Sequence, residues 1–329
     1  MPDGPAPTSA AAGALPLGPL GLGCADLGNL YAGMSDEQAH DVLEAAWACG
    51  VRCFDTAPHY GLGLSERRLG AFLATRPRAE YVVYTKVGHL LRPSPDTAHL
   101  QDEAHQFAVP ADQRRVWDAS ADGVRRSLEE SLQRLGLARV DVLYLHDPEE
   151  HDLHASLTTA VPALAALREQ GVVTAVGLGS KSVPALLAGV RTGALDLVMV
   201  AGRYTLVEQP AATDLLPACR AAGVGVVAAA VYNSGLLSRP APDASARYEY
   251  GEVPADVLAR AQAIEQVCVA HGVPLPVAAL QYPLRDPVVR GVVVGAATRA
   301  QVRENVARTS CEVPEALWEE LRERRLVPA

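Results

Sequence analysis

Short apolar segments alternate with longer amphipathic segments along almost the whole chain. Continuous apolar runs of this kind are typical of strands that are buried on both faces. The intervening segments carry helix boundaries: residues 35–38 (SDEQ) form a capping-box pattern with Gly50 as the stop, and Ser120 and Gly136 bound a later helix. The predicted strands, rich in valine and leucine, lie at residues 19–24, 51–55, 81–86, 140–146, 172–179, 195–202, 223–230 and 291–296.

This alternation predicts the fold class. Eight strands, each followed by a helix and without a break in composition, predict an α/β fold made of one closed (β/α)8 TIM barrel. The alternative is an open doubly wound sheet, which is disfavoured because residues 21–28 (GLGCADLG) do not match the GxGxxG pattern. Residues 87–118 and 231–252 form long loops after the third and seventh strands. Both loops leave the C-terminal face, where active sites of this fold lie.

The two ends of the chain are set apart from this barrel. Residues 1–15 have no basic segment and contain several prolines, so we expect a mobile tail and not a signal peptide. Residues 16–329 are expected to form a single domain. Within it, residues 314–325 (PEALWEELRERR) are expected to form an accessory helix outside the barrel.

Composition narrows the possible functions. The 329 residues carry a formal charge of 29 − 38 = −9 without a basic stripe, so nucleic acid is not an expected partner. No apolar run approaches the roughly 18 residues of a membrane helix, so no membrane partner is expected either. The six cysteines are too scattered for a disulfide framework or a structural zinc site. These features predict a reduced, cytoplasmic protein without a bound metal, either a monomer or a weak homo-oligomer.

The candidate chemistry lies at the ends of the predicted strands. Asp55, Lys86 and His146 end the second, third and fourth strands, where an ionisable residue of a barrel is a candidate for catalysis. Asp141 and Asp196 begin strands and are therefore expected to be structural. An acid, a cation and an imidazole at one rim point to an enzyme active site.

Several motifs resemble the aldo-keto reductase superfamily. They are FDTAPHYGLGLSERRLG (54–70), the YTK strand end, LHDP (145–148), VYNSGLL (231–237) and RENV (303–306). The resemblance extends from about residue 18 over nearly all of the chain. It is strongest to the branch of sugar 1-dehydrogenases that includes the L-fucose, L-galactose and D-threo-aldose dehydrogenases, with the pyridoxal-type dehydrogenases nearby.

The resemblance implies a catalytic tetrad of Asp55, Tyr60, Lys86 and His146. Hydride transfer at a carbonyl or hydroxyl carbon requires a group that supplies or removes the proton of the oxygen. We expect Tyr60 to do so, with its pKa lowered by cationic Lys86, while Asp55 holds Lys86. His146 would orient the substrate oxygen, and the neighbouring His59 would line the pocket.

The resemblance also implies a nicotinamide cofactor across the barrel mouth. Tyr232 would stack on the nicotinamide, and the backbone amides of Ser234, Gly235 and Leu236 would follow the pyrophosphate. The positions assigned to the carboxamide region and to the adenine end are Ser180, Gln209, Glu304 and Asn305. The chain departs from the family at residues 179–181, because it reads Gly-Ser-Lys where many relatives have Ser-Asn.

The same comparison predicts that NAD is favoured over NADP. A 2′-phosphate is normally held by arginine or lysine. Gly295, Ala296 and Gln301 stand where NADP-preferring relatives often carry a lysine, a hydroxyl residue and an arginine, although Arg299 and Arg303 remain nearby.

The reaction predicted by the branch is oxidation of an aldose at C1 to a lactone. One alternative is an NADPH-dependent reductase of small aldehydes or ketones, and a second is a non-catalytic regulatory subunit that binds the cofactor. The substrate is a small sugar or carbonyl compound in either catalytic case. Residues expected to face it are Tyr31, His59, His89, Trp117 and Arg203, with Trp117 favoured because aromatic faces suit sugar rings.

Overall fold

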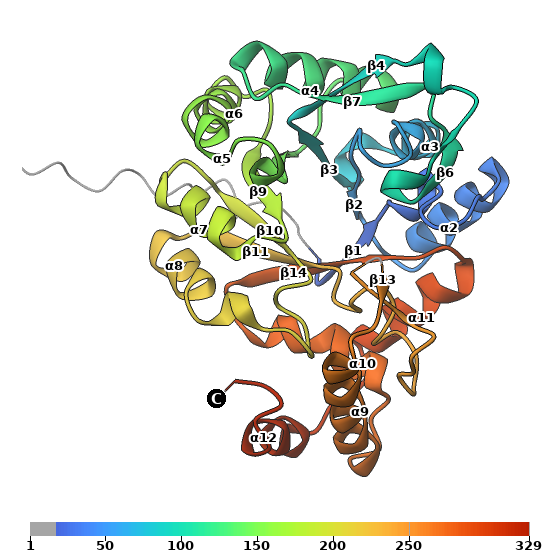
Figure 1. Ribbon diagram of the computed structural model, residues 1–329, viewed down its shortest axis with the longest axis vertical. Helices are drawn as coiled ribbons and strands as arrows, with labels where there is room; N and C mark the ends of the chain where they lie inside the picture. The colour runs from blue at the N-terminus through green and yellow to red at the C-terminus, as the bar shows by residue number, and fades with distance from the viewer. Residues whose placement is uncertain (1–17, 250, 329) are drawn as a thin grey trace, which may run out of the picture.

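The computed structural model describes residues 18–249 and 251–328, and the predicted N-terminal tail lies outside these ranges. Eight parallel strands form a closed barrel, so the predicted TIM-barrel class is confirmed (Figure 1). Each predicted strand overlaps an observed one. In barrel order starting from β1, the strands are β1 (Leu20–Gly23), β14 (Val289–Gly295), β11 (Gly225–Ala229), β10 (Leu197–Ala201), β9 (Ala175–Ser180), β8 (Val142–His146), β3 (Val82–Val87) and β2 (Cys53–Asp55).

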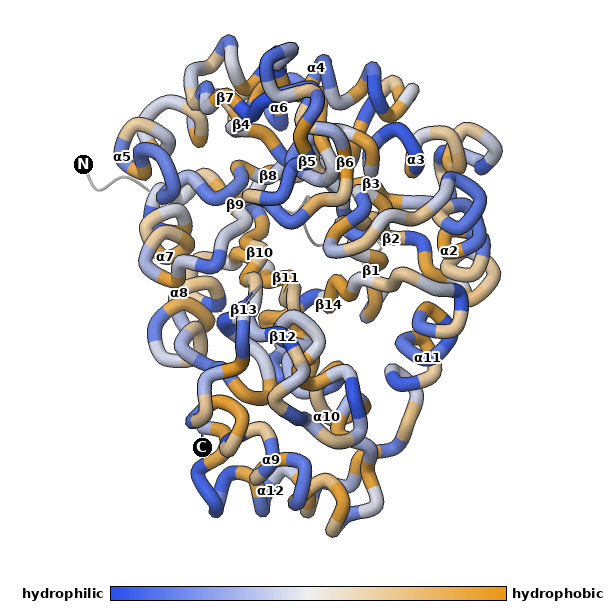
Figure 2. Tube along the Cα trace, turned by 45° about the vertical axis from the view of Figure 1, so that its right-hand side comes forward, coloured by the Kyte–Doolittle hydropathy of each residue, from blue (hydrophilic) through white to orange (hydrophobic). Residues whose placement is uncertain are grey.

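Helices surround the barrel and cover the outward-facing side chains of the strands (Figure 1). Figure 2 shows hydrophobic residues concentrated along the central strands, whereas the outer helices alternate between hydrophobic and hydrophilic positions. The helices are α2 (Asp36–Ala48), α3 (Leu64–Leu73), α4 (Ala121–Leu135), α5 (Leu153–Ala155), α6 (Val161–Glu169), α7 (Val183–Arg191), α8 (Leu215–Ala222), α9 (Ala255–Ala270), α10 (Leu275–Gln281), α11 (Arg299–Thr309) and α12 (Glu315–Glu323).

The predicted helix boundaries are confirmed where the sequence signals were clear. Ser35 caps α2 through a full capping box with Gln38. Ser120 caps α4, and Gly136 ends that helix in the left-handed conformation. The accessory helix α12 packs against α9 outside the barrel, with Trp318 buried.

Alternation along the strands separates the barrel interior from the helix-facing side. Tyr84 of β3 and Tyr144 of β8 belong to the small interior cluster and meet edge to face, with ring centroids 5.8 Å apart. Their neighbours Val83, Leu143 and Leu145 belong to the outer core beneath the helices. Side chains two residues apart lie on the same face of a strand. The residue two positions after each interior tyrosine therefore also faces inward, and it lies at the mouth of the barrel.

The two strand-initial aspartates are structural, as expected. Asp141 accepts hydrogen bonds from the Val83 amide and from Arg78, each 2.8 Å. Asp196 accepts from the Val176 amide (2.9 Å) and from Arg168 (2.8 Å). Both carboxylates therefore tie neighbouring strands together at the N-terminal end of the barrel.

The two long loops at the C-terminal face contain short strands. The first loop forms two antiparallel pairs, β4 (His89–Pro93) with β7 (Gln113–Trp117) and β5 (Gln101–Asp102) with β6 (Phe107–Pro110). The second contains the pair β12 (Arg247–Tyr248) and β13 (Gly251–Glu252). The predicted long loops are thus ordered hairpins that stand on the same face as the strand ends carrying Asp55, Lys86 and His146.

In the described part of the chain, no single helix has the length and apolar character needed to cross a membrane. One pair of helical segments, Ala255–Ala270 and Leu275–Arg285, satisfies the criterion only when the two are joined, and they are bent by 103°.

Candidate active site

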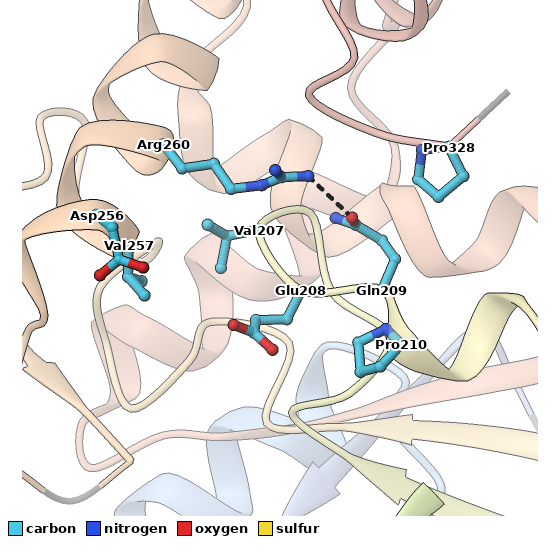
Figure 3. A pocket seen from close by; sticks show the side chains of 8 residues that line it. All are labelled: Val207, Glu208, Gln209, Pro210, Asp256, Val257, Arg260 and Pro328. Atoms are coloured by element: carbon cyan, nitrogen blue, oxygen red, sulfur yellow. Dashed lines mark hydrogen bonds between the residues drawn. The ribbon is translucent and has the colours of Figure 1, made fainter.

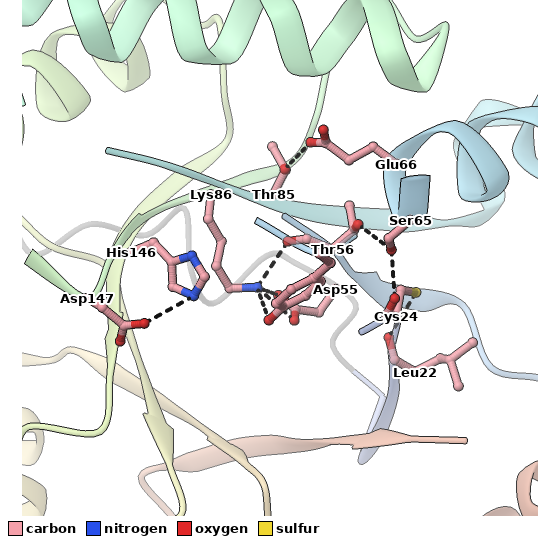
Figure 4. A network of polar contacts seen from close by, with 11 residues as sticks. Leu22, Cys24, Asp55, Thr56, Ser65, Glu66, Thr85, Lys86, His146 and Asp147 are labelled. Atoms are coloured by element: carbon pink, nitrogen blue, oxygen red, sulfur yellow. Dashed lines mark hydrogen bonds and ion pairs between the residues drawn. The ribbon is translucent and has the colours of Figure 1, made fainter. Parts of the chain in front are cut away.

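Lys86 lies at the centre of a compact polar cluster at the barrel mouth (Figure 4). Its Nζ donates to Asp55 Oδ1 (2.7 Å) and Oδ2 (2.8 Å), to the Thr56 carbonyl (3.0 Å) and to the Tyr60 hydroxyl (3.0 Å). Lys86 and Asp55 are almost completely buried, with 2% and 3% of their surface exposed. A buried ammonium therefore has its charge balanced by one carboxylate and also contacts the phenol.

The strands explain why these side chains meet. Asp55 follows Cys53 on the inward face of β2, Lys86 follows Tyr84 on β3, and His146 follows Tyr144 on β8. Since β2 pairs with β3 and β3 pairs with β8, the three inward side chains come from three consecutive strands. The sequence prediction that the strand ends share one site is confirmed.

Tyr60 reaches the cluster from the loop that follows β2. This loop packs against the loop after β1, and at the contact point neither loop has room for a side chain. A Cβ on Gly61 would lie 2.2 Å from the Gly28 carbonyl oxygen, and a Cβ on Gly28 would lie 2.6 Å from the Tyr60 carbonyl carbon. Gly61 also has a φ of 59°, which favours glycine. The two glycines thereby fix the backbone of Tyr60.

The rest of the motif around Tyr60 holds this loop in place. The Ser65 hydroxyl donates to the Cys24 carbonyl (2.6 Å) and lies 2.8 Å from the Thr56 hydroxyl. Glu66 accepts from the Thr85 hydroxyl (2.7 Å), next to Lys86, and from Arg134 on α4 (2.5 Å). The SE pair of the motif therefore connects the site to the helices around it.

One electrostatic expectation, a lowered pKa of Tyr60, is wrong. Burial and then the negative charge of Asp55 hold the pKa of Tyr60 well above its ordinary value. The ammonium of Lys86, which is also paired with Asp55, does not outweigh these two effects, so the predicted net lowering is not found. Tyr60 is therefore a protonated phenol at neutral pH.

His146 lies among other histidines on the opposite side of the site from Asp55. Ring centroids of Tyr60, His59 and His89 lie 6.1, 5.7 and 6.2 Å from that of His146. Burial and the charge of Lys86 keep the pKa of His146 well below its ordinary value, so this ring is neutral. Burial lowers the pKa of His89 to about 4.

Two of the five predicted substrate positions, His59 and His89, lie beside this imidazole, and a third, Trp117, lies against His89. Trp117 contacts His89, with centroids 3.7 Å apart, and stacks on His151 at 5.4 Å and an interplanar angle of 9°. His59 has a buried Nδ1 without a hydrogen-bond partner among residues 18–249 and 251–328. The loop containing β4 and β7 thus presents an aromatic wall beside His146.

The other two positions contact the protein itself. Arg203 forms ion pairs with Glu249 and, at 3.8 Å, with Glu208, so its charge is already neutralised. Tyr31 is hydrogen-bonded to Ser234, and Arg247 covers its ring at 4.4 Å. Neither residue has a contact with the tetrad in the described structure.

The positions predicted for the two ends of the cofactor form one cluster. The Tyr232 hydroxyl donates to Asn305 Oδ1 (3.1 Å) and accepts from Arg308 (3.1 Å), which also pairs with Glu304 at 3.1 Å. Asn305 Nδ2 donates to the Gly295 carbonyl (3.4 Å). The position predicted to stack on the nicotinamide, Tyr232, is thus hydrogen-bonded to Asn305, which was predicted for the adenine end.

The two residues predicted to contact the carboxamide of the nicotinamide form hydrogen bonds with other protein groups. Ser180 donates to Glu149, and its Oγ accepts from the Ser182 amide at 2.7 Å. Gln209 donates to the carbonyls of Thr205 and Leu206, both 2.8 Å. Gln209 also accepts from Arg260 in the wall of a separate cavity of about 390 Å³, between the segment that follows β10 and α9 (Figure 3).

The loop after β11 has the conformation of a ligand-binding turn, although two of its amides are occupied. Asn233, Ser234 and Gly235 have successive φ values of 47°, 57° and 103°. The amides of Gly235 and Leu236 donate to the carbonyls of Tyr232 and Asn233 within the turn. This conformation therefore does not offer those amides to a pyrophosphate, contrary to the prediction.

Three polar residues of the mouth were missed in the sequence. Asn233 has a buried Oδ1 without a donor among the described residues. Asp26, in the short helix Asp26–Gly28 after β1, has a pKa raised to about 6 by burial. Asp147 follows His146 and has a pKa raised to about 7 by burial and by Glu150 and Glu149. Each of them lies just after a predicted strand, and this position could have identified them from the sequence.

These features fit a polyhydroxylated dinucleotide. Asn233 and Asp26 offer acceptors at the ends of β11 and β1, and a ribose provides hydroxyl donors. Gly235 and Gly295 lie near these two residues, and neither glycine has a side chain that would cover its backbone. The residues available to hold a nicotinamide cofactor are thus Asn233 and Asp26, together with Tyr232 and Asn305.

The closed barrel thus brings a buried Asp–Lys pair, a tyrosine and a neutral histidine together at its carboxyl-terminal mouth. The Aldo/keto reductase family matches residues 19–325. The chain belongs to this family and is an oxidoreductase that uses a nicotinamide cofactor, so the predicted membership is confirmed.

Known relatives agree with this assignment. The chain is 54% identical to a D-threo-aldose 1-dehydrogenase from Pseudomonas sp over 323 residues, 98% of each protein. It is 36% identical to a pyridoxal 4-dehydrogenase from Microbacterium luteolum over 94% of each protein. These matches confirm the predicted likeness to the sugar dehydrogenase branch.

Solved structures support the fold. An aldo-keto reductase from Bacillus halodurans in its holo form is 23% identical, with a TM-score of 0.72 over 94% of this chain and 92% of its own. A glycerol dehydrogenase from Gluconobacter oxydans is 21% identical, with the same TM-score over 96% of this chain and 95% of its own.

Proposed function

We propose that the protein oxidises an aldose at C1 to the corresponding lactone, with NAD⁺ as the hydride acceptor. The observation that carries the proposal is the Lys86–Tyr60 contact of 3.0 Å within the tetrad. The 54% identical relative, a D-threo-aldose 1-dehydrogenase, supports an aldose as the substrate.

Each tetrad residue has a distinct part in this reaction. Nicotinamide, when bound in its oxidised form, accepts hydride and contributes a positive charge. Tyr60 removes the proton of the C1 hydroxyl as the C1 hydrogen leaves as hydride, and the carbonyl of the lactone forms. Lys86 stabilises the phenolate, and Asp55 balances the charge of Lys86 and holds it in place. Neutral His146 hydrogen-bonds the C1 oxygen and orients it.

The preference for NAD receives support from Asp26. A Cβ on Gly295 would lie 2.6 Å from Asp26 Oδ2, so a lysine at position 295 would collide with this carboxylate unless the carboxylate moved. The same negative charge disfavours a phosphate at that place. Gln301 is the partner of Thr298 in a capping box at the start of α11, and so it has a structural role in place of an arginine.

The second candidate is carbonyl reduction, and one observation favours it. Burial raises the pKa of Tyr60, which keeps the phenol protonated and ready to donate to a carbonyl oxygen. The non-catalytic alternative is set aside because the tetrad is completely assembled.

The test is a steady-state assay of NAD⁺ and NADP⁺ reduction with a panel of aldoses, including L-fucose, and identification of the lactone. Turnover that rises from pH 6 to 9 is expected. Activity that falls over this range, together with faster reduction of aldehydes, would contradict the proposal and favour the reductase.

A further inference from the structure

Asp147 is an unusual carboxylate for a position so close to the tetrad. It follows His146 directly and adopts the left-handed conformation with a φ of 45°. Its Oδ2 lies 3.4 Å from His146 Nε2, and Figure 4 shows the carboxylate turned toward the imidazole. About a quarter (23%) of the side chain is exposed, so a ligand in the mouth can reach it.

The 3.4 Å approach of His146 Nε2 is the one side-chain contact of this carboxylate among the described residues. The Asp147 amide donates to the Gly179 carbonyl and the Asp147 carbonyl accepts from the Glu150 amide, but apart from His146 no group in residues 18–249 or 251–328 contacts its Oδ atoms as a donor. The nearest imidazole is neutral, because burial holds the pKa of His146 well below its ordinary value. A partly desolvated acceptor without a donor is costly unless a ligand supplies one.

The position of the carboxylate identifies the part of the substrate that it contacts. Under the proposed function, on which this inference rests, His146 holds the C1 oxygen of an aldose. C1 of a cyclic aldose has two ring neighbours: C2, which carries a hydroxyl, and the ring oxygen, which has no hydrogen to donate. Vicinal oxygens of a sugar lie roughly one hydrogen-bond length apart, which is comparable to the 3.4 Å between Asp147 and His146.

We propose that Asp147 accepts a hydrogen bond from the C2 hydroxyl of the aldose and thereby selects the configuration at C2. Only the C2 side of the ring can satisfy the carboxylate, so the contact also determines which face of C1 is presented for hydride removal. Asp147 is in this sense a specificity-determining residue for the proposed reaction.

Three pentoses isolate this contact. D-Arabinose and D-ribose differ only in configuration at C2, and 2-deoxy-D-ribose lacks the C2 hydroxyl. A hydrogen bond to a charged group corresponds to about ten- to a hundredfold in affinity. The wild-type enzyme should therefore prefer one of the two C2 epimers over the 2-deoxy sugar by about this factor in kcat/KM.

Two variants suit the backbone at position 147. Asp147→Asn keeps the shape and tolerates a positive φ, and Asp147→Gly removes the side chain without steric strain. Both should lower kcat/KM for the preferred epimer by about ten- to a hundredfold while that for 2-deoxy-D-ribose stays within about threefold. Glu150→Gln is the control, since it removes a neighbouring charge without removing the acceptor, and it should keep wild-type discrimination.

The possible outcomes distinguish a failure of this inference from a failure of the proposed aldose dehydrogenase function. Equal losses with all three sugars would show that Asp147 only positions His146, and equal wild-type rates for all three would show that C2 is not selected. Either result overturns the inference while leaving the aldose dehydrogenase intact. Absence of turnover with every aldose in the panel would overturn the proposed function, and this inference with it.

Discussion

The two halves of the barrel mouth differ in how their polar groups are used. At the ends of β2, β3 and β8, the side chains of Asp55, Lys86 and His146 point toward one another and toward Tyr60. At the ends of β9, β11 and β14, the groups expected to hold the cofactor are bonded to the protein: Ser180 to Glu149, and the amides of Gly235 and Leu236 within their own turn.

This difference between the two halves shows which of them is preorganised for a ligand. The half of the mouth that carries the tetrad is held by buried charge pairs and by close glycine contacts that fix the backbone. Its hydrogen-bond donors are therefore in place before a ligand binds. If the second half binds the cofactor as proposed, internal hydrogen bonds must be exchanged for bonds to a ligand, and this exchange consumes binding energy. Four predictions test this contrast.

Removal of the Tyr60 hydroxyl should have the largest effect. Tyr60→Phe deletes the proton-transfer group, and kcat should fall by about 10²–10⁴-fold. Cofactor affinity should change little, because the contacts of the second half are untouched. Fluorescence quenching on titration with NAD⁺ measures the affinity alongside the rate.

Tyr144→Phe is the matched control for this substitution. Its hydroxyl is buried inside the barrel without a hydrogen-bond partner among the described residues, so its loss should leave the rate unchanged. A Tyr60→Phe variant that keeps most of the wild-type rate would remove Tyr60 from the mechanism.

Lys86→Met should damage both stability and the pH profile. It leaves Asp55 buried without its partner, which costs about 3–5 kcal/mol of unfolding free energy. Oxidation requires the phenolate, so activity rises with pH toward the pKa of Tyr60, which burial already holds high. Without the ammonium this rise should move to still higher pH. Urea unfolding and a pH–rate profile measure the two effects, and an unshifted profile would contradict the role of Lys86.

Asp26→Asn should shift cofactor preference by an intermediate amount. The wild-type enzyme should favour NAD⁺ in kcat/KM, because the Asp26 carboxylate stands beside Gly295. Removal of this charge should raise relative use of NADP⁺ by about tenfold. Arg299→Ala is the comparison, since Arg299 is exposed and paired with Asp41 at 3.7 Å. A wild-type preference for NADP⁺ of tenfold or more would show that Arg299 or Arg303 already binds the 2′-phosphate.

The same contrast explains what the sequence could predict. The eight strands and the positions of Asp55, Lys86 and His146 followed from apolar runs and from strand ends, since alternation determines which side chains enter the barrel. The bonds of Gln209 and Tyr232 could not be predicted in this way. Their partners, Arg260 and Asn305, lie 51 and 73 residues along the chain.

The errors have physical causes. The pKa of Tyr60 was expected to fall because Lys86 favours the phenolate, whereas burial and the charge of Asp55 determine its direction. Asp147 could not be placed from the sequence, because its contact with His146 depends on a positive φ that the LHDP motif does not reveal.

The smallest expected effect concerns stability at Asp147. Its pKa of about 7 in the folded protein, against 3.8 ordinarily, means that the folded state binds the proton more tightly. Stability is therefore lost as pH rises through the window from about 4 to 7, and the loss is complete above it. Burial, Glu149 and Glu150 raise this pKa, whereas Lys181 and Lys86 oppose the rise and His146 is neutral.

Asp147→Asn does not titrate and should raise the unfolding free energy at pH 8.5 by about 1–2 kcal/mol relative to the wild type, with almost no difference at pH 4.5. The gain is smaller than the full shift of the pKa represents, because the amide is partly buried in its place. Urea unfolding at both pH values measures it, and Glu150→Gln should give a smaller gain in the same direction. A variant that is destabilised equally at both pH values would show that the wild-type carboxylate is satisfied within the protein, and it would then have no need of a hydroxyl from the substrate.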